Sequence, residues 1–175
     1  MSGSIGSTGA ATKNKDGAVV VVDISDVQVT DDPNVVLATY ALGSCIGVVA
    51  YDRKRCVGGM LHYMLPLSRT NPTRAKERPA MFADTGLPLL FEKMYAFGCD
   101  KSDIIVKVVG GGQLYDDRGT FDIGRRNYAI LNKIFKNNGV KVLAEDVGGT
   151  ASRSVRMLVG TGDVVVRSHG REATL

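Results

Sequence analysis

The stretch "ALGSCIGVVAYD", residues 41–52, places Cys45 directly after a Gly-Ser pair and directly before an apolar run. The run is rich in valine and isoleucine and is typical of a β-strand. The basic tripeptide at 53–55 predicts a turn, and "CVGGMLHYML" at 56–65 predicts a return strand. The two strands are expected to form a β-hairpin, with His62 on one face of the second strand.

Outside the hairpin, periodicity predicts further strands and two main helices. Strands are expected at 18–30, 35–42, 103–112, 140–147, 154–160 and 163–167. One helix begins near Leu87 or is kinked there by Pro88, and the other spans 122–139 with Asp122 as its N-cap. The polar segment 67–79 contains two prolines and is expected to be an exposed loop. This order favours a mixed β-sheet with helices packed on one face.

Length and composition bound the domain organisation. A chain of 175 residues suits a single domain, expected here at 18–170, followed by a short C-terminal tail at 171–175. The first 17 residues lack the basic and apolar regions of a secretory signal and are expected to be a disordered tail. No apolar run approaches the roughly 20 residues that span a bilayer. We therefore expect a cytoplasmic protein without direct membrane insertion.

Several classes of site are disfavoured. The three cysteines, Cys45, Cys56 and Cys99, form no CxxC pair, which argues against a disulfide framework and against a structural metal site. The net charge is +4, but the basic residues are scattered and there is no tryptophan, so we expect no nucleic-acid partner. The glycine run 110–112 lacks the phosphate-binding patterns and is interpreted as a turn near the active site. No cofactor is expected.

Cys45 and His62 carry the functional question. Free cysteine is usually a small buried hydrophobe, and this interpretation is preferred for Cys56 and Cys99. Cys45 differs because Gly43 allows a sharp turn, at which backbone N–H groups could stabilise an oxyanion. His62 on the neighbouring strand could lower the pKa of the thiol. The residues alone leave a nucleophile and a core cysteine as equal alternatives.

Five motifs spread along the chain resemble the CheD family of chemoreceptor glutamine deamidases. They are "TYALGSCIGVVAYD", "GGMLHYMLP", "GRRN", "DVGGTASR" and "TGDVVV", in the family's order between about residues 20 and 167. The resemblance implies an α/β sandwich shared in outline with toxin deamidases. It also implies Cys45 as the nucleophile, His62 as the base and Thr39 as the third catalytic residue, with Gly43 and Ser44 giving backbone support to the oxyanion.

The resemblance further implies the substrate and partners. Methyl-accepting chemotaxis receptors would be the substrate, with specific glutamines converted to glutamate and ammonia released. A CheC-type phosphatase would be a second partner, and an alternative function is a non-catalytic module that stimulates that phosphatase. Arg126 and Asn127 of "GRRN" are expected to cap a helix and to be solvated at the surface. Ala41 departs from the family pattern, where glycine is common.

Overall fold

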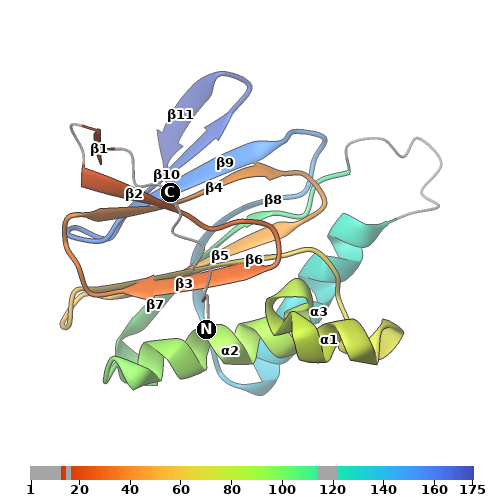
Figure 1. The fold of residues 1–175 in the computed structure, drawn as a ribbon. Helices are drawn as coiled ribbons and strands as arrows, with labels where there is room; N and C mark the ends of the chain where they lie inside the picture. Colours follow the sequence, from red (N-terminus) through yellow and green to blue (C-terminus); the bar gives the residue numbers. More distant parts are fainter. Residues whose placement is uncertain (1–12, 15–16, 114–121) are drawn as a thin grey trace, which may run out of the picture.

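The computed structural model describes residues 13–14, 17–113 and 122–175. Two β-sheets pack face to face, and helices cover the outer face of one of them (Figure 1). The α/β sandwich with helices on one face is therefore confirmed. Within the described residues, no helix is both long enough and apolar enough to cross a bilayer.

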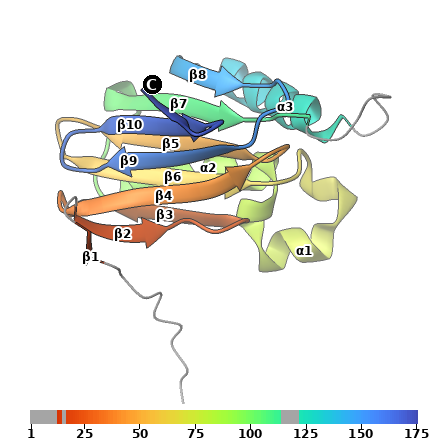
Figure 2. The same cartoon turned by 90° about the horizontal axis from the view of Figure 1, so that it is seen from above.

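The strands divide between a six-stranded and a five-stranded sheet, both of mixed direction (Figure 2). In spatial order, the six-stranded sheet consists of β1 (Lys13–Asn14), β2 (Gly17–Val21), β4 (Val35–Leu42), β9 (Arg153–Leu158), β10 (Asp163–Ser168) and β11 (Arg171–Thr174). The five-stranded sheet consists of β3 (Asp26–Thr30), β6 (Val57–Tyr63), β5 (Ile46–Asp52), β7 (Ile104–Gly110) and β8 (Val142–Val147).

The predicted hairpin of β5 and β6 is confirmed and lies in the middle of the five-stranded sheet. The two strands are antiparallel, and Gly47 lies opposite His62. Every residue of both strands is buried. The reason is that one face packs on the other sheet, through residues such as Val49 and Met60, and the opposite face packs on the helices, through residues such as Leu61. A strand covered on both faces has the near-continuous apolar sequence seen here.

The prediction of one strand over 18–30 was wrong, because this segment forms β2 in one sheet and β3 in the other. The chain crosses between the sheets at residues 22–25, where Ser25 has a φ of 62°. Both strands share the same valine-rich alternation, so the pattern does not show the crossing. This crossing lies next to the candidate site, since Ser25 N–H donates to the carbonyl of His62.

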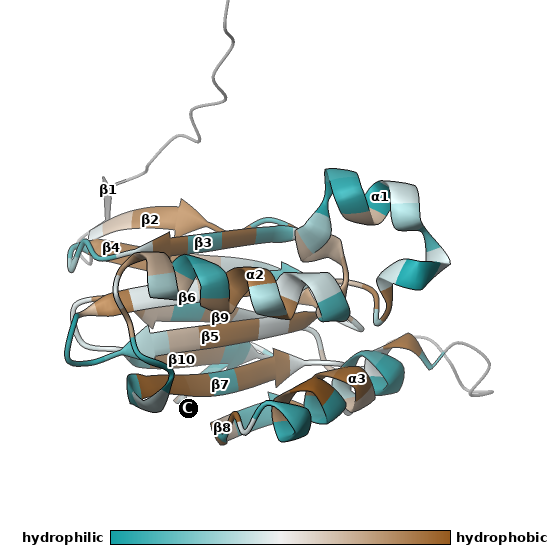
Figure 3. Ribbon diagram, turned by 90° about the horizontal axis from the view of Figure 1, so that it is seen from below, coloured by the Kyte–Doolittle hydropathy of each residue, from teal (hydrophilic) through white to brown (hydrophobic). Residues whose placement is uncertain are grey.

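Two long helices, α2 (Ala83–Ala96) and α3 (Ile123–Asn137), pack on the outer face of the five-stranded sheet (Figure 3). The helix predicted over 122–139 is confirmed. The α2 helix begins before Leu87 and contains Pro88 in its interior. Gly59 allows close approach of α2 to β6, because a Cβ at this position would lie 2.9 Å from Leu90 Cδ1.

The segment 67–79 is not a plain loop, which corrects the prediction. It contains a 3₁₀ turn η1 (Ser68–Thr70) and a short helix α1 (Pro72–Glu77). A second 3₁₀ turn, η2 (Pro79–Met81), begins at its last residue. The sequence carries the signal for this helix: the Asn71 side chain accepts from the backbone N–H of Arg74, and a proline occupies the first helical position. A third 3₁₀ turn, η3 (Lys101–Asp103), precedes β7.

The N-terminal and C-terminal segments that were expected to be tails have different outcomes. Most of residues 1–17 lie outside the described residues. Residues 171–175, expected as a tail, contain β11, whose four residues pair with β10. All four are exposed and mostly polar, so their strand conformation comes from ladder hydrogen bonds rather than from an apolar pattern.

The packing of α2 on the sheet gives a stability prediction. Leu90 is fully buried, so Leu90→Ala is expected to lower the free energy of unfolding by about 2–5 kcal/mol. The matched control is Leu143→Ala, because Leu143 is 67% exposed and its truncation should change stability by less than about 0.5 kcal/mol. Urea unfolding followed by circular dichroism measures both. Equal effects of the two substitutions would contradict the assigned core.

Candidate active site

Cys45 lies in a tight turn that connects β4 of one sheet to β5 of the other. The pairing of β4 with β9 shifts register between Thr39 and Leu42, and Ala41 within this bulge has a φ of 55°. A bulge bends a strand and redirects the chain. Here it leads from Thr39 into the turn at residues 43–45, which we name the nucleophile turn.

The glycine run 110–112 supports this turn, although it is the end of β7 and the segment after it rather than the turn that the sequence predicted. Gly111 N–H donates to the carbonyl of Cys45 at 2.8 Å, and Gly112 N–H donates to the carbonyl of Gly43 at 2.7 Å. Gly110 has a φ of 113°, and a Cβ there would lie 2.3 Å from the Cys45 oxygen. Glycine is therefore required for the close backbone approach that holds the turn.

Thr39 and His62 meet between the two sheets, although they are 23 residues apart in the chain. Thr39 Oγ1 lies 2.8 Å from His62 Nδ1, and the same hydroxyl donates to the carbonyl of Val22 at 2.7 Å. A hydroxyl has only one proton to donate. Because Val22 receives it, Thr39 must accept from His62, and the hydrogen-bond network therefore assigns the ring proton to Nδ1.

This tautomer makes Nε2 of His62 the basic nitrogen. His62 is only 1% exposed, and Nε2 is buried without a hydrogen-bond partner among the described residues. Burial lowers the pKa of His62 from its ordinary 6.5 to about 4, against a smaller opposing effect of the Asp23 carboxylate. The imidazole is thus neutral at physiological pH and has a free lone pair, as a general base requires.

Cys45 lies close to His62 along the hairpin, two residues before its partner Gly47. Since Gly47 is directly opposite His62 and the last pair of the hairpin is Ile46 with Tyr63, Cys45 lies one residue beyond the paired part of β5. Cys45 is half-buried against the core between the sheets. Burial raises the pKa of its thiol, and the backbone N–H of Cys45 itself acts in the opposite direction. The resting pair is therefore a neutral thiol and a neutral imidazole, not an ion pair.

The other predicted residues are placed as follows. Gly43 and Ser44 form the nucleophile turn with Cys45. Cys56 donates through its thiol to the carbonyl of Val159, far along the chain, and Cys99 is buried in the helix-side core. Within the described residues, no group of three or more His, Cys, Asp or Glu side chains is arranged to hold a metal ion.

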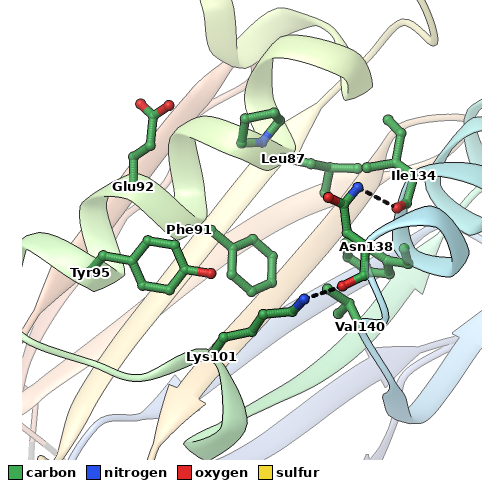
Figure 4. Close-up of a pocket in the computed structure, with 10 residues that line it drawn as sticks. Leu87, Phe91, Glu92, Tyr95, Lys101, Ile134, Asn138 and Val140 are labelled. Atoms are coloured by element: carbon green, nitrogen blue, oxygen red, sulfur yellow. Dashed lines mark hydrogen bonds between the residues drawn. The ribbon is translucent and has the colours of Figure 1, made fainter.

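A separate hollow of about 270 Å³ lies between α2 and α3 (Figure 4). Phe91 and Tyr95 line it from α2, and the Lys101 amine donates to the carbonyl of Asn138 at its opposite side. Its lining includes neither Cys45 nor His62. The hollow is a gap in the helix layer and is distinct from the candidate active site.

Asn127 is the residue whose place the sequence analysis got wrong. Arg126 is exposed as expected, but Asn127 is fully buried. Its side-chain amide donates to the carbonyls of Ser44 and Met64, both at 3.0 Å. It therefore contacts the nucleophile turn. The available signal was its position in the "GRRN" motif; an asparagine near a helix start was interpreted as a capping or surface residue.

With this geometry established, comparison with known proteins gives the family. Residues 64–168 match the family model described as CheD chemotactic sensory transduction. A protein of Anaeromyxobacter dehalogenans named "Probable chemoreceptor glutamine deamidase CheD 2" is 50% identical over 158 residues, covering 90% of this chain and 99% of the relative. This chain belongs to the CheD family.

Two further comparisons were found, one with a second relative and one with a solved structure. A CheD relative from Solibacter usitatus, with the name "Probable chemoreceptor glutamine deamidase CheD", is 46% identical and covers 89% of this chain and 92% of its own length. A crystal structure of a Neisseria meningitidis protein of the DUF152 family is 14% identical, with a TM-score of 0.40 over 75% of this chain and 62% of the other.

The lowered pKa of His62 predicts a pH-dependent stability. In the unfolded chain His62 binds a proton near pH 6.5, but in the folded chain only near pH 4. Between these values acid favours the unfolded state, so stability is lost as the pH falls. His62→Gln should remove this contribution and lose about 2 kcal/mol less than the wild type between pH 7 and pH 4.5.

Urea unfolding at a series of pH values measures the effect. His169→Gln is the matched control, because His169 is exposed and the variant should keep the pH dependence of the wild type. Parallel curves for the wild type and His62→Gln would contradict the assignment of a buried neutral imidazole.

Proposed function

We propose that this CheD protein hydrolyses the side-chain amide of specific glutamines on methyl-accepting chemotaxis receptors, producing glutamate and ammonia. Relatives up to 50% identical are named chemoreceptor glutamine deamidases. The observation that carries the proposal is the state of His62: Nδ1 is hydrogen-bonded to Thr39, and Nε2 is buried without a partner among the described residues. His62 lies opposite Gly47, two residues after Cys45. A base in this state can take the proton of a neighbouring thiol.

The first half of the reaction transfers the acyl group to sulfur. Nε2 of His62 accepts the Cys45 thiol proton as the sulfur attacks the carboxamide carbon of the glutamine. The developing oxyanion is stabilised by backbone N–H groups of Ser44 and Cys45. The imidazolium then returns its proton to the departing nitrogen, which leaves as ammonia and not as an amide anion. A γ-glutamyl thioester on Cys45 remains.

The second half hydrolyses this thioester. Nε2 of His62 takes a proton from a water molecule, whose oxygen attacks the thioester carbon. The carbon–sulfur bond breaks, the thiol recovers its proton, and the glutamate is released. Throughout, Thr39 accepts the Nδ1–H of His62, so the same nitrogen serves as base and acid in both halves. The chemistry consumes one water for each ammonia released and requires no metal or organic cofactor.

The remaining assignments rest on family membership. We place the deamidase unit at residues 18–170 and its action in the cytoplasm. A CheC-type phosphatase is proposed as a second partner on the same basis. Because Thr39, Cys45 and His62 are all present and two of them are hydrogen-bonded together, the catalytic role is favoured over the non-catalytic alternative.

The identity of the nucleophile is tested by substitution. Cys45→Ala should abolish conversion of glutamine to glutamate in a receptor cytoplasmic fragment, measured by mass spectrometry, because no other thiol can replace it. Cys56→Ala is the matched control and should retain activity, since its thiol contacts the carbonyl of Val159. Conversion by Cys45→Ala at the wild-type rate would refute the mechanism.

The role of Thr39 is tested by a pair of substitutions of similar volume. Thr39→Ser retains the hydroxyl and should keep kcat within about tenfold of the wild type. Thr39→Val removes the acceptor for Nδ1–H and should lower kcat about a hundredfold, because the ring can then adopt the unproductive tautomer. Ammonia release from the receptor fragment measures both rates. Equal rates for the two variants would exclude Thr39 as the group that fixes the tautomer.

A further inference from the structure

Asn127 occupies the position at which the β5–β6 hairpin opens. The last residue pair of the hairpin is Ile46 with Tyr63. Beyond this pair the two strands separate, and the next residues toward the site belong to the nucleophile turn on one side and to the segment after His62 on the other. The side-chain amide of Asn127 lies between them and donates one hydrogen bond to Ser44 and one to Met64.

These two hydrogen bonds orient the amide without ambiguity. Both partners are carbonyl oxygens, so the group that faces them must be the NH₂ and not the oxygen. The Oδ1 atom on the other side is buried and has no partner among the described residues. A buried unpaired acceptor costs free energy. The contribution of Asn127 therefore lies in the two bonds that it donates.

Asn127 is itself held rigidly. Its backbone carbonyl accepts from the hydroxyl of Tyr63, a fully buried residue next to His62, at 2.9 Å. The start of α3 is pressed against the glycine run, since a Cβ on Gly124 would lie 2.5 Å from the carbonyl of Gly112. Asn127 thus connects α3 to β6, which carries His62, and to the nucleophile turn.

All three carbonyls of the nucleophile turn are consequently fixed. Those of Gly43 and Cys45 accept from backbone N–H groups of the glycine run, and that of Ser44 accepts from Asn127. The bond from Asn127 is the only one of the three made by a side chain. Through Met64, the residue directly after β6, Asn127 also reaches the segment that carries His62.

We propose that Asn127 is a positioning residue for the amide hydrolysis. By joining the nucleophile turn to the end of β6, its side chain sets the separation between Cys45 Sγ and His62 Nε2. The proposal rests on the proposed function. Asn127 has no exposed surface, so it acts on the catalytic pair and not on the bound receptor. Loss of its bonds should therefore lower kcat and leave KM unchanged, because misplacement of reacting groups by about 1 Å costs roughly a hundredfold in rate.

The test compares Asn127→Ala and Asn127→Asp with the matched control Asn137→Ala, which truncates an exposed asparagine of the same helix. Thermal unfolding first establishes a temperature at which every variant is folded. Ammonia release from the receptor fragment then gives kcat and KM. In parallel, alkylation of Cys45 by iodoacetamide is followed between pH 6 and pH 10 by mass spectrometry of the Cys45 peptide.

Both Asn127 variants are expected to lose about 10- to 100-fold in kcat, with KM within about twofold of the wild type. In Asn127→Ala, alkylation of Cys45 should move to lower pH, because a loosened turn relieves the burial that raises the pKa of this thiol. Deamidation then falls while reactivity toward a small electrophile rises. A merely structural role would change neither profile in the folded protein. Asn137→Ala should match the wild type in both.

Wild-type kcat and a wild-type alkylation profile in both Asn127 variants would overturn the proposal. If neither variant folds, Tyr63→Phe provides the decision, since it removes only the hydroxyl that holds the Asn127 carbonyl. It should change kcat and alkylation in the same directions, by about two- to fivefold in kcat, and no change would overturn the proposal. If the wild type deamidates no receptor fragment, the proposed function fails, whereas the alkylation profiles still decide whether Asn127 positions Cys45.

Discussion

The hydrogen bond between Thr39 and His62 depends on the packing of one sheet on the other. Thr39 belongs to β4 of the six-stranded sheet, and His62 belongs to β6 of the five-stranded sheet. Both side chains are buried among apolar residues of the core between the sheets. A buried polar pair is costly unless its partners are present. The sandwich must therefore bring its two sheets to one relative position, and that position fixes the tautomer of the candidate base.

The electrostatic state of the pair follows from this burial. Burial lowers the pKa of His62 and raises the pKa of Cys45, so both groups are neutral before substrate binds. A thiol in this state reacts slowly with oxidants and small electrophiles, because the thiolate is the reactive form. The sulfur would become nucleophilic only when a carbonyl is close enough to receive it as the proton moves to Nε2. A thiol of this kind would therefore react with a docked protein substrate in preference to small electrophiles.

The sequence predicted the parts of this site that depend on local pattern. Alternation and a turn signal located the hairpin, and motif resemblance predicted Thr39, Cys45 and His62 as the catalytic residues. Contacts between distant segments could not be predicted in this way. Nothing in "AVVVVDISDVQVT" marks residues 22–25 as a crossing between sheets, yet this crossing supplies the Val22 carbonyl that determines the tautomer. Asn127 was misinterpreted for the same reason, since its partners lie 83 and 63 residues away.

Ala41 shows how the fold reconciles local strain with the geometry of the site. A φ of 55° is the left-handed region, which costs a residue with a Cβ roughly 1–2 kcal/mol relative to right-handed backbone. Glycine would adopt it without strain. The strained residue lies between Thr39, held by two hydrogen bonds, and the nucleophile turn, held by its carbonyls. Because both ends are fixed, the bulge has no freedom to relax, and the strain is retained where the chain must change sheets within a few residues.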